Sequence, residues 1–190
     1  MISLMVFLGN PGPQYSGNRH NVAWQFADSL DLTKSLMWRE KFRGHFASYG
    51  GRNLWFLKPG TFMNLSGESA GELARFYKIT PAEILVVQDE LELPLGTVSL
   101  KWSGGLGGHN GLRSMEAVFG VRDFWRLRFG IGRPEHPDIY GYVLSDFPAA
   151  EQERLRFVFQ QTAALFTALL TQEPELFLAE WGKKKITTPS

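Results

Sequence analysis

The chain has 190 residues, 44% of them hydrophobic, which is enough for one domain to bury a sizeable core. Its net charge of +1 excludes a protein that is basic overall, so any surface for nucleic acid would be a local patch. It has no cysteine, which excludes disulfides, cysteine-ligated zinc and a thiol nucleophile. The apolar N-terminus is too short for a signal peptide, and no segment approaches the ~20 apolar residues of a membrane span. We therefore expect a soluble, cytoplasmic protein with a single domain over residues 1–190.

Apolar runs and turn residues predict strands that alternate with helices, with one hairpin. In chain order, the expected elements are a strand at 4–8, a helix at about 21–31, hairpin strands at 42–49 and 54–57, a helix after residue 64, a single helical turn at 81–83, strands at 84–87 and 98–102, a helix from 112, a strand at 124–131, and helices at 149–170 and 173–181. This order predicts a three-layer α/β/α domain with a mixed, mostly parallel, twisted sheet. The lysine-rich tail, residues 183–190, is expected to be frayed.

Polar groups follow several of the predicted strands. The loop after the first strand carries an amide, a phenol and an imidazole, at Asn10, Tyr15 and His20. Asn64, Asp89 and a glycine-rich loop at 104–111 each follow another strand. Ligands of open α/β sheets bind beyond the carboxyl ends of strands. If these strands are neighbours that run the same way, the groups share one rim of the sheet, and His20 can join them.

A histidine within reach of an aspartate is a general base whose tautomer and charge are set by the carboxylate. The helix that follows His20 would lower the imidazole pKa and Asp89 would raise it, so their balance decides whether the base is free near neutral pH. An amide donor aimed at a developing oxyanion would add to the rate. Residues 65–69 lack the first glycine of a nucleophile elbow, and the four histidines lack metal-ligand spacing. The set predicts an esterase without metal or cofactor, in which His20 activates water.

Other interpretations of these residues stay open at this point. Asn64 and Asn110 are both placed to cap helices, and Asp89 could start a turn. Lys101 and Arg128, on predicted strands, could be solvated edge charges. The glycine loop lacks the third glycine of a dinucleotide fingerprint and the Gly-Lys-Ser/Thr of a P-loop, so it indicates a nucleotide binder only weakly.

Five stretches resemble motifs of the bacterial peptidyl-tRNA hydrolase family, in the same order and over residues 4–144. They are 9–21 (GNPGPQYSGNRHN), 58–67 (KPGTFMNLSG), 89–96 (DELELPLG), 107–114 (GGHNGLRS) and 126–134 (RLRFGIGRP). The resemblance implies a monomeric, phosphorylase/hydrolase-like sandwich that acts in translation and ribosome rescue. It would hydrolyse, without a metal, the ester that joins a peptide to the 3′ ribose of tRNA.

The resemblance also implies roles for particular side chains. They are the base His20 with its partner Asp89; the substrate-positioning amides Asn10, Asn64 and Asn110, with Asn10 counted as catalytic; the cleft-lining Tyr15, Phe62 and Met63; and Lys101 and Arg128, which would clamp the tRNA 5′ phosphate. Asn18 and Glu92 depart from the family pattern, and the C-terminal third resembles it only in length and helical pattern. The alternative from another class is an RNA-binding relative without turnover, such as those that assist intron splicing in plant organelles.

Overall fold

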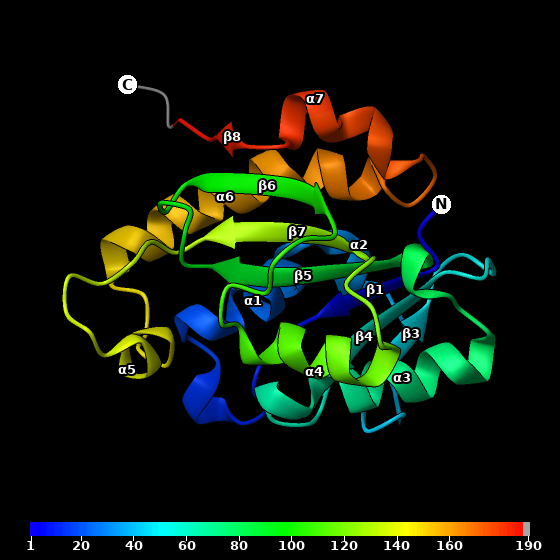
Figure 1. The fold of residues 1–190 in the computed structure, drawn as a ribbon. Helices are drawn as coiled ribbons and strands as arrows, with labels where there is room; N and C mark the ends of the chain where they lie inside the picture. Colours follow the sequence, from blue (N-terminus) through cyan, green and yellow to red (C-terminus); the bar gives the residue numbers. More distant parts are fainter. Residues whose placement is uncertain (188–190) are drawn as a thin grey trace.

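The computed structural model describes residues 1–187, in which eight strands form one mixed sheet (Figure 1). The strands are Leu4–Phe7 (β1), Arg39–Lys41 (β2), Gly44–Ser48 (β3), Trp55–Pro59 (β4), Ile84–Glu90 (β5), Thr97–Trp102 (β6), Trp125–Gly130 (β7) and Lys184–Lys185 (β8). They lie in the order β2-β3-β4-β1-β5-β7-β6-β8. The central strands β4, β1, β5 and β7 are parallel, and the outer strands pair antiparallel. The predicted mixed, mostly parallel sheet is confirmed in its centre.

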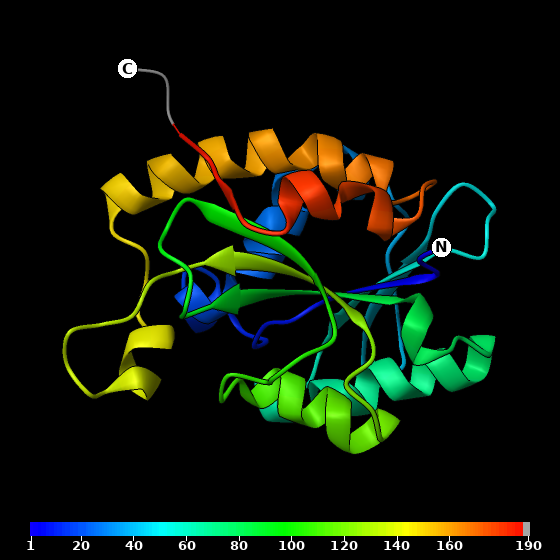
Figure 2. The same cartoon turned by 45° about the horizontal axis from the view of Figure 1, so that its top comes forward.

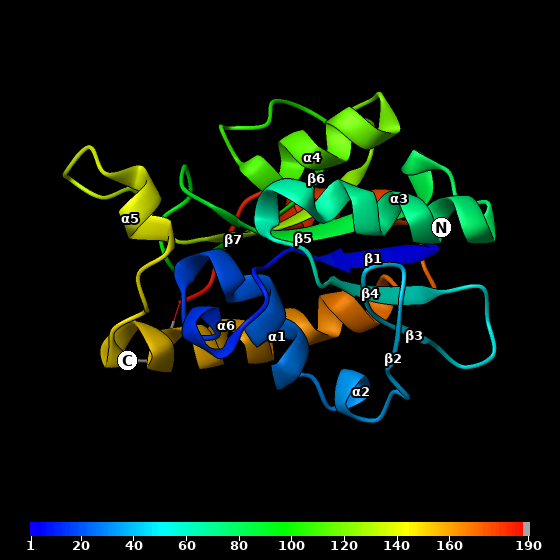
Figure 3. The same cartoon turned by 90° about the horizontal axis from the view of Figure 1, so that it is seen from below.

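Helices cover both faces of this sheet. They are Val22–Ser29 (α1), Asp31–Lys34 (α2), Ser66–Tyr77 (α3), Asn110–Phe119 (α4), Ile139–Val143 (α5), Ala149–Ala168 (α6) and Leu178–Trp181 (α7). Figure 3 shows α3 and α4 on one face and α1 and α6 on the other, which confirms the three-layer architecture. Short 3-10 turns precede four of the helices or strands, and the turn Pro81–Glu83 carries the predicted capping box between Thr80 and Glu83. The strand β2 and the helix α5 were not predicted.

β1 is buried along its whole length and divides its side chains between the two cores. Met5 and Phe7 belong to the core beneath α1 and α6, where the Phe7 and Phe166 rings lie 5.9 Å apart. Leu4 and Val6 belong to the core beneath α3 and α4. This alternation follows from the two-residue period of a strand, and it explains why a strand covered on both faces is a continuous apolar run.

The C-terminal tail differs from the prediction. Lys184 and Lys185 form β8, which pairs with Val98 and Thr97 of β6, and the tail runs beside β6 in Figure 2. The Ile186 N–H donates to the Gly96 carbonyl at 2.7 Å, and the Ile186 side chain is buried. A frayed tail is therefore wrong for residues 184–186, because they cover the otherwise open edge of β6. Residues 188–190 of the predicted tail lie outside the described residues.

The direction of β6 also differs from the expectation that all of the strands before the polar groups run the same way. β6 is antiparallel to β7, with Trp102 opposite Trp125, so β6 ends at the rim where the parallel strands begin. The glycine loop that follows it, residues 103–109, runs back across β7 and β5 to reach the start of α4 (Figure 1). Among residues 1–187, no helix is long and apolar enough to cross a membrane.

Candidate active site

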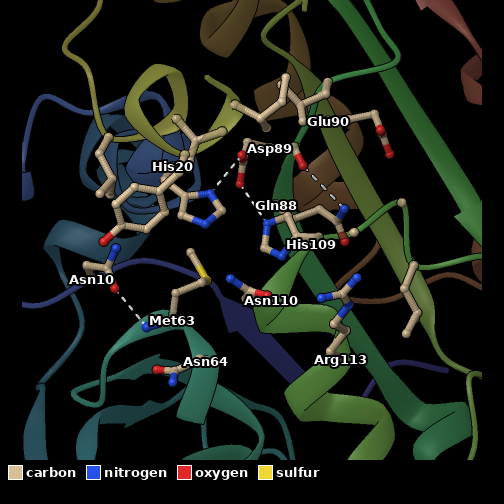
Figure 4. A pocket seen from close by; sticks show the side chains of 18 of the residues that line it. Asn10, His20, Met63, Asn64, Gln88, Asp89, Glu90, His109, Asn110 and Arg113 are labelled. Carbon is tan, nitrogen blue, oxygen red and sulfur yellow. Dashed lines mark hydrogen bonds and ion pairs between the residues drawn. The ribbon is translucent and has the colours of Figure 1, made fainter. Parts of the chain in front are cut away.

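The carboxyl-end rim of the parallel strands opens into a cavity of about 770 Å³ (Figure 4). It brings together most of the predicted site residues, which are Asn10, Tyr15, His20, Phe62, Met63, Asn64, Asp89 and Asn110. Asn10 follows β1, Asn64 follows β4 and Asp89 lies near the end of β5, as expected for neighbouring parallel strands. His20 reaches the cavity from a 3-10 turn, Arg19–Asn21, that leads into α1.

Asp89 is buried and receives an imidazole on each carboxylate oxygen (Figure 4). His20 Nδ1 lies 2.8 Å from Asp89 Oδ2, and His109 Nε2 lies 2.8 Å from Asp89 Oδ1. An ionised carboxylate only accepts hydrogen bonds, so each of these ring nitrogens donates its proton to Asp89. The Nε2 atom of a neutral His20 is therefore unprotonated, and in Figure 4 it faces the space between Asn10 and Asn110.

The protonation of His109 is fixed from its other side. His109 is the N-cap of α4, and its Nδ1 atom accepts from the backbone N–H groups of Gly111 and Leu112 at 3.1 and 3.4 Å. An atom that accepts these bonds carries no proton, so the proton sits on Nε2 and faces Asp89. His20, Asp89 and His109 lie close enough together to surround a cation. A protonated Nε2 cannot act as a ligand, however, so the arrangement fits a hydrogen-bonded triad better than a metal site.

Burial and charge act against each other at this triad. Burial alone would lower the pKa of His20, but the charge and hydrogen bond of Asp89 outweigh it, and the pKa of His20 is raised above its usual value. Burial alone would raise the pKa of Asp89, but the His20 and His109 imidazoles outweigh it and hold that pKa well below its usual range. Asp89 therefore stays ionised across the physiological range.

The Asn10 amide is oriented by backbone groups. Its Oδ1 atom accepts from the Met63 N–H at 2.7 Å, so its NH₂ group remains available to the cavity. The Asn10 backbone is fixed by Asn21, whose side chain accepts from the Asn10 N–H and donates to the Asn10 carbonyl, each at 2.9 Å. These contacts hold the Asn10 NH₂ group at the cavity, where it could stabilise a negatively charged oxygen of a substrate.

Asn64 and Asn110 are exposed at the cavity and do not cap helices. The N-cap of α4 is His109, and no side chain caps α3. Within residues 1–187, neither amide has a hydrogen-bond partner of its own. The capping interpretation of both residues is therefore wrong, and their amides are free to meet a ligand.

An aromatic wall borders the same cavity. The Tyr15 and Phe62 rings meet edge to face with centroids 6.4 Å apart, and Phe62 is largely exposed. Met63, the next residue along the chain from Phe62, is buried and also lines the cavity. An exposed aromatic beside polar groups is a surface on which a nucleobase or an apolar side chain can stack.

Lys101 and Arg128 do not line this cavity. They lie on β6 and β7, where register places Lys101 opposite Arg126 and Arg128 opposite Ser99. All four side chains therefore share one face of the sheet. Arg128 donates to Ser99 Oγ at 2.7 Å and pairs with Glu90 at 3.3 Å, whereas Lys101 forms no ion pair within residues 1–187.

Sequence reasoning missed three residues that shape the site. His109 holds Asp89, Asn21 fixes the backbone of Asn10, and Arg126 binds the glycine loop. Each lies in a motif that was singled out, but nothing local reveals which distant group it meets. Arg126 alone gave a usable signal, because a charged residue within an apolar strand run must find partners.

An imidazole held by a buried carboxylate beside a free amide, at the carboxyl-end rim of a mixed α/β sheet, is the arrangement of a hydrolytic enzyme that uses a histidine as its base. A family model described as "Peptidyl-tRNA hydrolase" matches residues 4–188. The chain belongs to the peptidyl-tRNA hydrolase family.

Curated relatives and solved structures agree with this assignment. The chain is 46% identical to a peptidyl-tRNA hydrolase of Treponema pallidum, over 97% of this chain and 96% of that one. It is 47% identical to one of Rhodospirillum centenum, over 92% and 78%. The crystal structure of peptidyl-tRNA hydrolase from Acinetobacter baumannii superposes with a TM-score of 0.86 at 33% identity, covering 95% and 94% of the two chains.

Proposed function

We propose that this chain hydrolyses the ester bond between a peptide, or an N-blocked aminoacyl group, and the 3′ ribose of tRNA. The observation that carries the mechanism is the proton arrangement at Asp89, which leaves His20 Nε2 unprotonated and facing the space between Asn10 and Asn110. An ester needs less activation than an amide, and a positioned base contributes ~10²–10⁴ in rate, so a single imidazole with one amide donor is sufficient machinery.

In this mechanism His20 Nε2 takes a proton from water as the water oxygen bonds to the ester carbon. The carbonyl oxygen becomes an oxyanion and accepts a hydrogen bond from the Asn10 NH₂ group. When the tetrahedral intermediate collapses, the bond to the ribose 3′ oxygen breaks, and the His20 imidazolium returns its proton to that oxygen. The products are a free peptide acid and tRNA with its 3′ hydroxyl. Asp89 stays ionised and stabilises the imidazolium.

The remaining predicted residues position the substrate in this proposal. Asn64 and Asn110 offer free amides to the peptide or the terminal nucleotide, and Tyr15, Phe62 and Met63 form the wall of the cleft. Lys101 and Arg128 share one face of the sheet and do not line the cavity, so in this proposal they contact another part of the tRNA, its 5′ phosphate. The protein would act as a monomer in the cytoplasm, the compartment that contains peptidyl-tRNA.

The proposed steps use no metal, and the His20, Asp89 and His109 group is unsuited to hold one, because His109 presents a proton rather than a lone pair to Asp89. A chelator is therefore expected to leave the rate of ester hydrolysis unchanged. Activity that disappears with a chelator and returns with one divalent ion would contradict this part of the proposal.

The decisive assay compares N-acetyl-aminoacyl-tRNA with unblocked aminoacyl-tRNA, with release of the acyl group as the readout. We expect fast release from the blocked substrate only, and a loss of at least ~10² in kcat for His20→Ala with tRNA binding kept. His45→Ala, which removes an exposed histidine outside the cavity, is the matched control. Binding of the blocked substrate without release would favour the RNA-binding relative without turnover.

A further inference from the structure

The loop of residues 103–109 connects the two opposite rims of the sheet. It leaves β6 at one rim of the sheet, yet it must deliver His109 and Asn110 to the cavity at the other rim. Four of its residues are glycines, and Gly104, Gly107 and Gly108 have positive φ values, so its backbone conformation is unusual. A glycine-rich segment loses much conformational freedom when it is fixed, so this path needs tertiary anchors.

Arg126 of β7 supplies two such anchors. Its Nη1 atom donates to the Gly105 carbonyl at 2.6 Å, and its Nη2 atom donates to the Gly104 carbonyl at 2.9 Å. The side chain is 1% exposed. No carboxylate forms an ion pair with it in the part of the chain that the structure describes, so its buried charge is compensated by these carbonyl dipoles and by the Phe124 ring, whose centroid lies 5.0 Å from Cζ. Such a charge strongly favours the loop position that satisfies it.

The guanidinium shape matches this task. Two successive carbonyls are met by two nitrogens of one planar fork, which the single ammonium of a lysine cannot reproduce. Burial and the nearby charge of Arg128 lower the pKa of Arg126 to about 10, so it remains protonated at neutral pH. Gly104 suits this path, because its φ of 107° lies in a region that residues with a side chain rarely adopt.

The other anchors of the loop lie at its two ends. Ser103 donates from its backbone to the Phe124 carbonyl at 3.0 Å, and His109 donates to Asp89 at 2.8 Å. The Arg126 bonds hold the stretch between these ends. We propose that Arg126 is a positioning residue, whose two hydrogen bonds hold the loop across the sheet and thereby place His109 on Asp89 and Asn110 in the cavity. The inference deepens the proposed hydrolysis and rests on it for its kinetic readout.

The first test compares Arg126→Lys with Arg122→Lys, in which an exposed arginine paired with Glu116 is replaced just before β7. Arg126→Lys keeps the charge and loses the fork. We expect kcat to fall by ~10–10²-fold, because a small displacement of groups beside the reacting ester is costly, with a smaller change in KM. Arg122→Lys should leave both constants unchanged. Unchanged kcat in Arg126→Lys would overturn the proposal.

A double-mutant cycle with His109→Ala separates positioning from general damage. If Arg126 acts through the loop that carries His109, then adding Arg126→Lys to His109→Ala should lower kcat by much less than it does in the native chain. Independent, multiplicative losses would overturn the proposed route through His109.

A third measurement does not depend on the substrate. In ¹⁵N-histidine-labelled native protein, His109 should show a protonated Nε2 and an unprotonated Nδ1, and Arg126→Lys should remove that pattern while the fold is kept. This result would hold even if peptidyl-tRNA were not the substrate, so the two proposals can fail separately. If Arg126→Lys does not fold, Gly104→Ala strains the same stretch from the loop side and leaves Arg126 itself in place, because Gly104 has a φ of 107° that alanine rarely adopts. An unchanged His109 spectrum in that variant would contradict the proposal.

Discussion

At the scale of single residues, His20 and His109 contact the same carboxylate through different nitrogens. His20 donates from Nδ1 and keeps Nε2 for chemistry, whereas His109 donates from Nε2 because its Nδ1 accepts backbone N–H groups. Each oxygen of Asp89 accepts a hydrogen bond from one imidazole, so the carboxylate contacts both histidines. The geometry therefore separates the base from the two groups that orient it.

This arrangement predicts a large effect for Asp89→Asn. The tautomer of His109 is fixed, so the asparagine oxygen would turn toward His109 and its NH₂ group toward His20 Nδ1. His20 would then carry its proton on Nε2 and could not accept one from water. We expect kcat to fall by ~10²–10⁴, close to the loss in His20→Ala, in a single-turnover assay. Asp28→Asn, at an exposed ion pair with Lys58, is the control. A loss much smaller than that of His20→Ala would contradict the tautomer argument.

The pH dependence follows from the same contacts. Only neutral His20 acts as a base, and Asp89 raises its pKa, so kcat/KM should rise with pH through a midpoint above the ordinary value of ~6.5. In Asp89→Asn the charge is absent and burial remains, so the pKa of His20 should fall below that value. The rate profile of the native chain and an NMR titration of His20 in both proteins check the two signs. An unchanged His20 titration in Asp89→Asn would show that the carboxylate does not control the base.

Asn10 offers a substitution that keeps its structural bond. Asn10→Asp retains an oxygen to accept from the Met63 N–H, but it replaces the NH₂ donor by a negative oxygen. We expect kcat to fall by ~10²–10³ with an unchanged Tm, because the lost group acts on the oxyanion. Asn53→Asp, in an exposed turn, should change neither quantity. Equal losses of Tm and activity at Asn10 would mean that its role is structural.

At the scale of elements, two adjacent residues at the start of α4 have different roles. His109 caps the helix, and Asn110 points its amide to the cavity. Asn110→Ser should therefore leave the Tm unchanged and lower activity. His109→Ala should lower both, with a stability loss of ~0.5–2 kcal/mol that is typical of a lost cap. Thermal melts and kinetics of both variants check this; a destabilised Asn110→Ser protein would show that Asn110 supports the helix after all.

At the scale of the whole molecule, a net charge of +1 gives little general attraction for a polyanion. Local cations must then carry most of the electrostatic binding, and Lys101 is the less constrained member of the predicted pair because Arg128 already contacts Glu90 and Ser99. Lys101→Ala should raise KM more than it lowers kcat, and should flatten the dependence of log affinity on log salt by roughly 0.7–0.9.

Lys101→Ala should also remove any preference for tRNA that bears a 5′ phosphate over dephosphorylated tRNA. Lys34→Ala, at an exposed lysine on α2 far along the chain from both predicted cations, is the control. A variant that keeps the native preference would place the phosphate site elsewhere on the protein.

The sequence by itself determined the features that depend on neighbours along the chain. Apolar runs marked the central strands, and polar residues directly after β1, β4 and β5 marked the rim, because the end of a parallel strand places its next residues at a common edge. The motifs around His20 and Asp89 then predicted the base and its partner, which the structure places 2.8 Å apart.

The tertiary structure alone decided what depends on distant partners. An alternating pattern is the same in a parallel and an antiparallel strand, so the direction of β6 was not readable, and neither was the return path of the loop to α4. Because of that path, His109 lies against Asp89 and is its second hydrogen-bond partner. The lysine-rich tail was equally unreadable, because charged residues form a strand only where an unpaired sheet edge supplies their hydrogen bonds.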